Sequence, residues 1–123
     1  KQDRGRTYYN SSQGFWYAYS VKNDSTSYLP ASGDEVLFRH EIRALNDDVY
    51  YSFDEMGIQS YLVDKQELIS GLQDGIKLMK AGERVDFLFP SHKAYGYTGN
   101  DKISPNEPLQ YTVEILEINK LSK

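Results

Sequence analysis

Alternation of apolar and polar positions divides the chain into strand-like runs. The alternation is clearest in residues 15–21, 36–43, 85–89 and 109–115, and its period of two is that of a half-buried strand. Residues 49–51 return after an Asn-Asp-Asp turn, which predicts a hairpin with 36–43. Residues 61–63 predict one further short strand, after a break at Met56-Gly57. Run 15–21 has aromatic residues on both faces, so we expect it to be central or covered.

One segment has a helical period instead. Leu72, Ile76 and Met79 share a face at the i, i+4, i+7 spacing, and Gly82 is suited to a left-handed C-cap. We predict a helix over about 70–80. Two capping-box patterns precede its apolar face, Asp64-x-x-Glu67 and Ser70-x-x-Gln73, and only one can be used; we place the start at Ser70.

Two glycines, Gly71 and Gly75, lie on one side of this helix. Each costs up to about 1 kcal/mol relative to alanine in a helix interior. We favour close packing of the helix on a sheet as the reason, with a functional need for bare backbone as the alternative.

The order of elements is strands first, then one helix, then two long strands. This order predicts an α+β fold, with an antiparallel sheet and its helix on one face. The 123 residues are enough for one compact domain, which we place at 14–123. Residues 1–13 are polar and predict a flexible tether.

Composition narrows the function classes. The net charge is −4 and the basic residues are scattered, which argues against nucleic-acid binding. The absence of cysteine excludes disulfides, thiol nucleophiles and cysteine-based metal sites. No apolar run approaches the ~20 residues needed to cross a bilayer.

Few residues predict acid–base or metal chemistry. The two histidines are far apart, and no clustered pattern predicts a metal site. We expect His40 to be a core or pocket-lining residue and His92 to be an exposed loop residue. The adjacent carboxylates Asp47-Asp48 and Asp54-Glu55 are typical of solvated turns. The loop between the last two long strands is different, because it carries Tyr95, Tyr97 and Ile103 among glycines and prolines, which predicts that it lines a pocket.

The same region carries a family resemblance. Phe89-Pro90, Ala94-Tyr95-Gly96, residues 99–105 and the closing strand to Ile118 resemble the C-terminal half of the FKBP family of peptidyl-prolyl cis-trans isomerases. Upstream matches to the helix and its following turn are Gly71, Gly75, Leu78, Met79, Gly82 and Glu83. Within the family the chain is most similar to the gliding-motility-associated lipoproteins of the GldI type. The motifs for that branch are Gly14-Phe15-Trp16-Tyr17, Asp64-Lys65-Gln66-Glu67-Leu68 and Phe87-Leu88-Phe89-Pro90.

The resemblance implies a twisted antiparallel sheet wrapped around one short helix, and a proline pocket. The implied pocket residues are Tyr51, Leu68, Ile69, Leu72, Tyr95, Ile103 and Tyr111. Tyr95 would donate its hydroxyl to a substrate carbonyl, and the Ile69 N–H would bind another. Leu72 would form the floor under the proline ring, between the walls Tyr51 and Tyr111. No cofactor is implied.

Several positions depart from the family pattern. The floor is usually tryptophan and here is Leu72. Ser52 replaces the acidic residue that usually follows the wall aromatic, and Asp54 is a possible stand-in. His40 takes the place of a pocket-side tyrosine, and Asn100 that of a loop histidine. The loop from there to Pro105 is about one residue shorter, and residues 53–60 match the family poorly.

The first functional hypothesis is therefore an FKBP-type isomerase that acts on Xaa-Pro bonds of proline-containing polypeptides in the cell envelope. Macrolide inhibitors are possible ligands. Because the chain begins at Lys1, a lipid anchor upstream of it is expected from the resemblance. The alternatives are the same fold as a binding or chaperone module with negligible turnover, and an anchored structural component of a motility machine.

Overall fold

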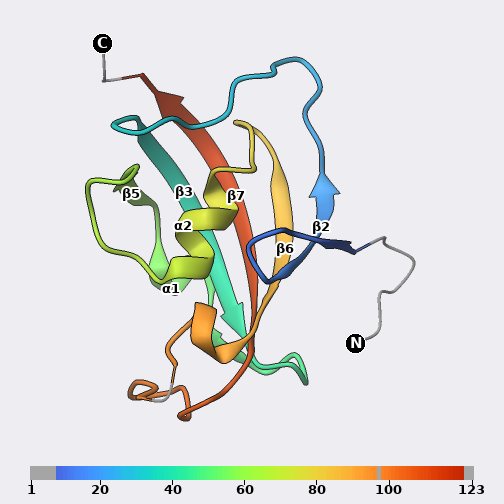
Figure 1. Ribbon diagram of the computed structural model, residues 1–123, viewed down its shortest axis with the longest axis vertical. Coiled ribbons are helices and arrows are strands. Elements are labelled where there is room, and N and C mark those ends of the chain that lie inside the picture. Colours follow the sequence, from blue (N-terminus) through green and yellow to red (C-terminus); the bar gives the residue numbers. More distant parts are fainter. Residues whose placement is uncertain (1–7, 97, 121–123) are drawn as a thin grey trace.

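Seven β-strands form one antiparallel sheet in the computed structural model, which describes residues 8–96 and 98–120 (Figure 1). The strands are β1 (Tyr9–Asn10), β2 (Trp16–Val21), β3 (Glu35–Arg43), β4 (Val49–Tyr51), β5 (Gln59–Leu62), β6 (Arg84–Phe89) and β7 (Leu109–Asn119). The helical elements are α1 (Phe53–Met56), α2 (Ser70–Ile76) and a 3₁₀ turn at Ser91–Lys93. The predicted α+β class is confirmed.

The sheet order is β1-β2-β6-β7-β3-β4, with β5 also paired to β3. Both β4 and β5 use the same edge of β3, because β4 pairs with residues 42–43 and β5 with residues 35–38. The other edge of β3 pairs with β7. In the sequence, α1 lies between β4 and β5, so the chain leaves the edge of β3 after β4 and returns to it at β5. The two-sided strand β2 is paired on both edges, as we predicted.

The core lies between α2 and one face of the sheet. Figure 1 shows α2 in front of β3 and β7. Val36, Phe38, His40 and Ile42 alternate along β3 as its buried positions. A Cβ added to Gly71 would lie 2.7 Å from the Phe89 ring, which confirms close packing as the reason for a glycine there.

Helix α2 starts at Ser70, as predicted, but not through the predicted capping box. Its N-cap is Ile69, and no side chain caps it. Gln73 instead donates its side-chain amide to the Leu68 carbonyl (2.6 Å). The Asp64 pattern is not a cap either, since Asp64 has a φ of 63° and pairs with Lys77 at 2.7 Å.

The helix also ends earlier than predicted, at Ile76 rather than near residue 80. The chain continues in tighter i to i+3 bonds, in which the N–H of Leu78 bonds Gly75 and that of Met79 bonds Ile76. This tighter turn keeps Met79 fully buried. Gly82 has the predicted left-handed conformation, with a φ of 86°. It lies in the turn before β6, where its N–H donates to Ile115 of β7 (2.8 Å).

Helix α1 was not expected, although the predicted break at Met56-Gly57 is confirmed by the C-cap at Gly57. The predicted strand 61–63 lies instead at Gln59–Leu62. Within the segment predicted as a tether, Tyr9–Asn10 forms β1 against Trp16–Tyr17. The rest of that prediction concerns residues 1–7, which lie outside the described residues, as does Tyr97.

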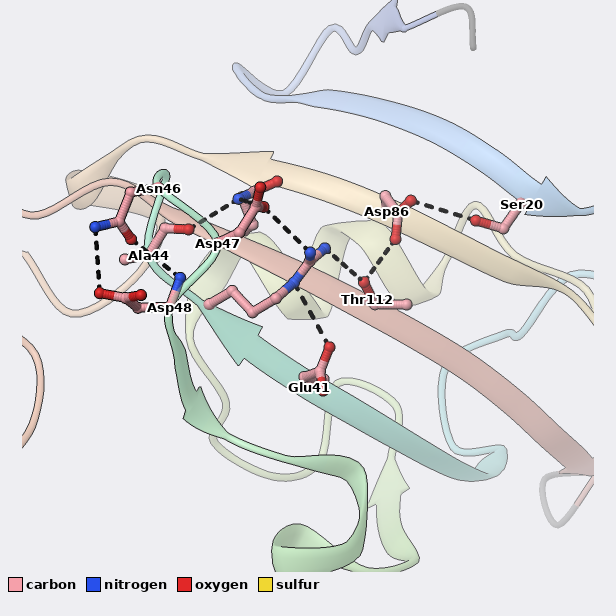
Figure 2. A network of polar contacts seen from close by, with 10 residues as sticks. Ser20, Glu41, Ala44, Asn46, Asp47, Asp48, Asp86 and Thr112 are labelled. Atoms are coloured by element: carbon pink, nitrogen blue, oxygen red, sulfur yellow. Dashed lines mark hydrogen bonds and ion pairs between the residues drawn. The ribbon is translucent and has the colours of Figure 1, made fainter. Parts of the chain in front are cut away.

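The face of the sheet opposite α2 carries a polar network across β2, β6, β7 and β3 (Figure 2). Thr112 and Ser20 donate hydrogen bonds to the two oxygens of Asp86, at 2.6 and 3.3 Å. Arg43 donates to Thr112 at 3.2 Å and to Asp47 at 3.3 Å. This network joins four strands through side chains as well as through the backbone.

Candidate functional site

All seven predicted pocket residues belong to the hydrophobic core of the domain or pack against it, and we call this set of seven the Leu72 cluster. Its buried members are Leu72 in α2, Ile103 in the 90–108 connection and Tyr111 on β7. Partly buried residues packed against the core are Tyr51, Leu68, Ile69 and Tyr95. The sheet register sets part of this arrangement, because Ile42 of β3 pairs with Tyr51 on one side and Tyr111 on the other.

Ile69 has extended backbone immediately before α2, with φ −59° and ψ 144°. Its carbonyl accepts the first helical bond, from the Gln73 N–H at 3.1 Å. Within the described part of the chain no group accepts a hydrogen bond from the Ile69 N–H. A helix N-terminus leaves such donors unpaired, and a ligand can satisfy them.

Tyr111, a member of the Leu72 cluster, forms a stacked pair with His40. Their rings are 5.7 Å apart with planes 7° from parallel, and Tyr111 is only 1% exposed. Burial raises the pKa of the Tyr111 hydroxyl, and the adjacent Tyr95 hydroxyl, which shares a hydrogen bond with it, raises that pKa further. Three aromatic or imidazole groups therefore meet at this point.

His40 is buried, as predicted for a core or pocket-lining residue. Its Nδ1 atom has no hydrogen-bond partner among the described residues. Burial lowers the pKa of His40 to about 4, because charging an imidazole in an apolar environment is costly. The imidazole is therefore neutral at pH 7.

The connection that carries Tyr95 and Ile103 is fixed by its own turns. The Tyr95 carbonyl accepts bonds from the Gly99 N–H (3.2 Å) and the Thr98 hydroxyl (3.1 Å). The Asn100 side chain accepts the N–H groups of Lys102 (2.9 Å) and Ile103 (2.8 Å). Gly99 has a φ of 63° and packs directly on the Ile103 carbonyl, so only glycine fits there without strain. These turns bury Ile103.

Tyr51 and Ser52 lie at the junction of β4 and α1. The Tyr51 ring is half-buried, and its hydroxyl accepts a bond from the Asn100 amide at 3.4 Å. The Ser52 hydroxyl caps α1 by accepting the Glu55 N–H at 3.1 Å. Substrate binding by Ser52 stays a prediction, and the hydroxyl already has this structural partner.

Asp54 does not take the place of the missing acidic residue, which corrects the stand-in expected from the sequence. Its side chain is fully exposed and lies 4.0 Å from Arg39. Arg39 points away from α2, since it alternates with the buried positions of β3. Phe53 lies on the same side, with the Arg39 and Arg84 guanidinium groups 5.2 and 4.8 Å from its ring. Helix α1 therefore turns these two residues away from the Leu72 cluster.

Sequence reasoning missed a group of polar residues beside the cluster: Tyr50, Glu55, Lys102 and Glu107. Part of the signal was available, because Ser52-x-x-Glu55 is itself a capping-box pattern. The partners of Lys102 and Glu107 are about 50 residues away in sequence, and no local pattern indicates them.

The structure gives no support for a metal site or a membrane span. Among residues 8–96 and 98–120, no three histidine or acidic side chains are grouped so that they can hold a metal ion. No described helix has the length and apolar character needed to cross a bilayer. A surface cavity of about 300 Å³ next to α2 is lined by polar residues of 64–67 and by Gln73, and it includes no member of the Leu72 cluster.

Comparison with known proteins identifies the family. A model of the FKBP-type peptidyl-prolyl cis-trans isomerases matches residues 27–116. The chain belongs to this family. The FKBP match includes every member of the Leu72 cluster.

Relatives of this FKBP chain include a probable FKBP-type peptidyl-prolyl cis-trans isomerase FkpA of Neisseria meningitidis. It is 29% identical over 101 residues, which are 81% of this chain and 37% of the relative. The peptidyl-prolyl cis-trans isomerase Mip of Coxiella burnetii is 30% identical over 103 residues, covering 83% and 44%. The chain thus spans less than half the length of these two relatives.

Solved structures show the same fold. FkpA from Escherichia coli superposes with a TM-score of 0.80 at 23% identity, over 94% of this FKBP chain and 53% of that protein. A peptidyl-prolyl cis-trans isomerase from Pseudomonas syringae has a TM-score of 0.78 at 22% identity, over 92% and 81%. The expected fold, an antiparallel sheet around one short helix, is confirmed.

Proposed function

We propose that this FKBP domain is a peptidyl-prolyl cis-trans isomerase that binds Xaa-Pro segments of polypeptides at the Leu72 cluster. The observation that carries the proposal is the combination of this cluster with the Ile69 N–H, which has no acceptor among the described residues. Family membership and the names of the relatives point to the same activity. The expected substrates are exported polypeptides that contain Xaa-Pro bonds and have not yet folded.

The chemistry requires no nucleophile and no cofactor. The barrier of about 18–20 kcal/mol to rotation comes from amide resonance, so a site that holds the twisted amide better than either planar isomer accelerates the reaction. Removing the prolyl amide from water serves the same purpose, because water stabilises the charge-separated planar form.

We assign a role in substrate binding to each residue of the proposed site. The Ile69 N–H and the Tyr95 hydroxyl donate to substrate carbonyls. Leu72 lies under the proline ring, with Tyr51 and Tyr111 as walls. Leu68, Ile103 and His40 complete the apolar surround, and Ser52 lies at its rim.

The test is the cis-to-trans relaxation of short peptides with Leu, Phe, Ala, Lys or Glu before proline. Uncatalysed relaxation takes tens of seconds, so weak acceleration is measurable. We expect acceleration by the native chain, strongest after apolar residues, and a loss in Tyr95→Phe. Acceleration that is unchanged in both Tyr95→Phe and Tyr95→Ala would contradict the assigned site.

A second candidate function is peptide binding with negligible turnover, which the replacement of the family's tryptophan floor by Leu72 favours. Leu72 is smaller and leaves a less shaped floor. No acceleration by the native chain together with a gain in Leu72→Trp would support the binding module. Both functions predict binding of proline-containing peptides, whereas a purely structural motility component predicts none.

We further place the protein in the cell envelope, as a lipoprotein of the GldI-like branch held by a lipid anchor upstream of this chain. The support is the motif resemblance at Gly14-Phe15-Trp16-Tyr17. Macrolide binding is proposed because relatives such as FK506-binding protein 4 of Neurospora crassa carry that ligand in their name. Metabolic labelling of the full-length protein with an alkyne fatty acid tests the anchor, and an unlabelled protein recovered outside the envelope fraction would refute it.

A further inference from the structure

A single lysine ties the loop that follows Tyr95 to the β4–α1 junction. The Lys102 ammonium group donates to the Tyr50 carbonyl at 2.7 Å and to the Glu55 carboxylate at 3.2 Å. The same nitrogen lies 4.5 Å from the centre of the Tyr51 ring. All three partners belong to the segment that carries the proposed Tyr51 wall.

Two other side chains join the same two segments. The Tyr50 hydroxyl donates to Glu107 at 2.6 Å, and the second Glu107 oxygen accepts the Ser104 N–H at 3.1 Å. The Asn100 amide donates to the Tyr51 hydroxyl. The contacts form a clasp between residues 100–107 and residues 50–55, with Lys102 making the most connections across it.

The direction of the Lys102 side chain is set by the loop itself. The side-chain oxygen of Asn100 accepts a hydrogen bond from the Lys102 N–H. The next residue, Ile103, is buried in the core. Lys102 is therefore anchored at its backbone. On the other segment the capping box of α1 fixes Glu55, whose carboxylate also accepts the Ser52 N–H at 3.2 Å. Hydrogen bonds from the Ser52 N–H and from Lys102 lower the pKa of Glu55, so it stays ionised at neutral pH.

A simple surface ion pair does not account for this arrangement. The Lys102 and Glu55 side chains are 44% and 50% exposed, and a pair of that kind contributes little by itself. A backbone carbonyl and the face of the Tyr51 ring complete the coordination of the ammonium group. The ring is thereby held against the loop that carries Tyr95 and Ile103.

We propose that Lys102 is a positioning residue that fixes the Tyr51 ring relative to Tyr95 and Ile103 and so sets the width of the proline site. This inference rests on the proposed isomerase function and adds a determinant outside the Leu72 cluster. Small displacements of positioning groups are costly in rate, because productive geometry is narrow.

The experiment compares Lys102→Met, which keeps the aliphatic stem, with Lys102→Arg, which keeps the charge and the donors. We expect kcat/KM for an apolar Xaa-Pro peptide to fall about 5-fold in Lys102→Met, the size of one cation–π contact. Lys102→Arg should stay within about 2-fold of the native chain. The matched control is Lys22→Met, which removes a cation–π contact with Tyr19 on β2 (4.9 Å) and should leave turnover unchanged.

A double variant separates positioning from general stabilisation. In a Tyr51→Leu background, Lys102→Met should have no further effect on kcat/KM, because its partner ring is gone. An equal loss in both backgrounds, or native turnover in Lys102→Met, would overturn the proposal.

A measurement that does not depend on turnover tests the positioning role of Lys102 separately from the proposed isomerase function. The ring-flip rate of Tyr51, followed by NMR on ring-labelled tyrosine and assigned with Tyr51→Phe, should rise in Lys102→Met but not in Lys22→Met. If the native chain fails to isomerise any peptide, the proposed function fails, but the flip rate still tests whether Lys102 positions the Tyr51 ring. If the flip rate and the ring chemical shifts of Tyr51 were both unchanged in Lys102→Met, the proposed role of Lys102 would be refuted.

Discussion

His40 shows how one residue couples the site to pH. It lies on the inner face of β3 among apolar neighbours, and its Nδ1 atom has no hydrogen-bond partner among the described residues. A buried, unpaired polar atom costs about 1–3 kcal/mol. The stack on Tyr111 and the contact with Phe38, whose ring centre lies 5.4 Å away, offset part of that cost. Burial keeps the imidazole neutral, and no acidic group of the described residues pairs with it.

We predict that His40 makes stability depend on pH below neutrality. Its pKa is lowered from 6.5 to about 4 on folding, so between these values the unfolded chain binds the additional proton. The stabilisation is complete above pH 6.5 and is lost as pH falls toward 4, by roughly 3 kcal/mol. The free energy of unfolding in urea, measured from pH 7 to 4, should therefore fall more steeply for the native chain than for His40→Phe. Parallel curves for the two proteins would contradict this prediction.

At the level of elements, α1 decides which side chains face the proposed site. Its capping box, Ser52 with Glu55, starts a single helical turn directly after the Tyr51 wall. The turn places Phe53 and Asp54 toward Arg39 on the opposite face of the sheet. Residues 53–56 therefore contribute to the site only through Glu55 and its bond to Lys102.

We predict that Ser52 acts on stability more than on substrate affinity. Ser52→Ala should lower the free energy of unfolding by about 1 kcal/mol, the usual cost of losing an N-cap, with peptide affinity within about 2-fold of native. Ser52→Asp is the matched variant, because aspartate caps equally well and restores the acidic residue typical of the family. Chemical denaturation and peptide titration measure the two effects. A large affinity loss in Ser52→Ala with native stability would show instead that the hydroxyl binds substrate.

At the scale of the whole molecule, the two faces of the sheet have different roles. The inner face holds α2 and the Leu72 cluster, and the outer face carries the polar network around Asp86 (Figure 2). Asp86 and Thr112 are each only 7% exposed, so their hydrogen bond is shielded from water. The network fixes β6 against β7, and these strands carry Phe89 and Tyr111 on the inner face.

We predict that Thr112→Val destabilises the whole domain by about 1–3 kcal/mol, because it removes a donor from a buried carboxylate. Thr112→Ser keeps the hydroxyl and should retain most of the stability. Ser20→Ala removes the longer of the two bonds to Asp86, of 3.3 Å, from an exposed residue, and should cost less than Thr112→Val. Thermal unfolding compares the variants. Native or higher stability in Thr112→Val would mean that the bond to Asp86 contributes nothing.

The sequence by itself determined the strands other than β1, the start of α2 and the family. Alternation along residues 36–43 and 109–115 is a local signal, because side chains of a strand point to opposite faces in turn. The glycines Gly71 and Gly75 likewise favoured a close approach of α2 to the sheet over the alternative, a functional need for bare backbone, and the contact of Gly71 with Phe89 confirms that approach. The motif around Tyr95 named the family and, through it, the residues of the Leu72 cluster, whose catalytic roles stay predictions.

Only the tertiary structure decided where α2 ends, where α1 lies and what surrounds His40. The helix gives way to tighter turns after Ile76, with Met79 still buried, and the local sequence pattern does not predict this change. The same holds for Lys102, whose partners Tyr50 and Glu55 are distant in sequence and meet it only when β4 and the 98–108 loop are in place. Local patterns record which face of an element is buried, whereas the pairing of distant polar groups follows from the assembled sheet.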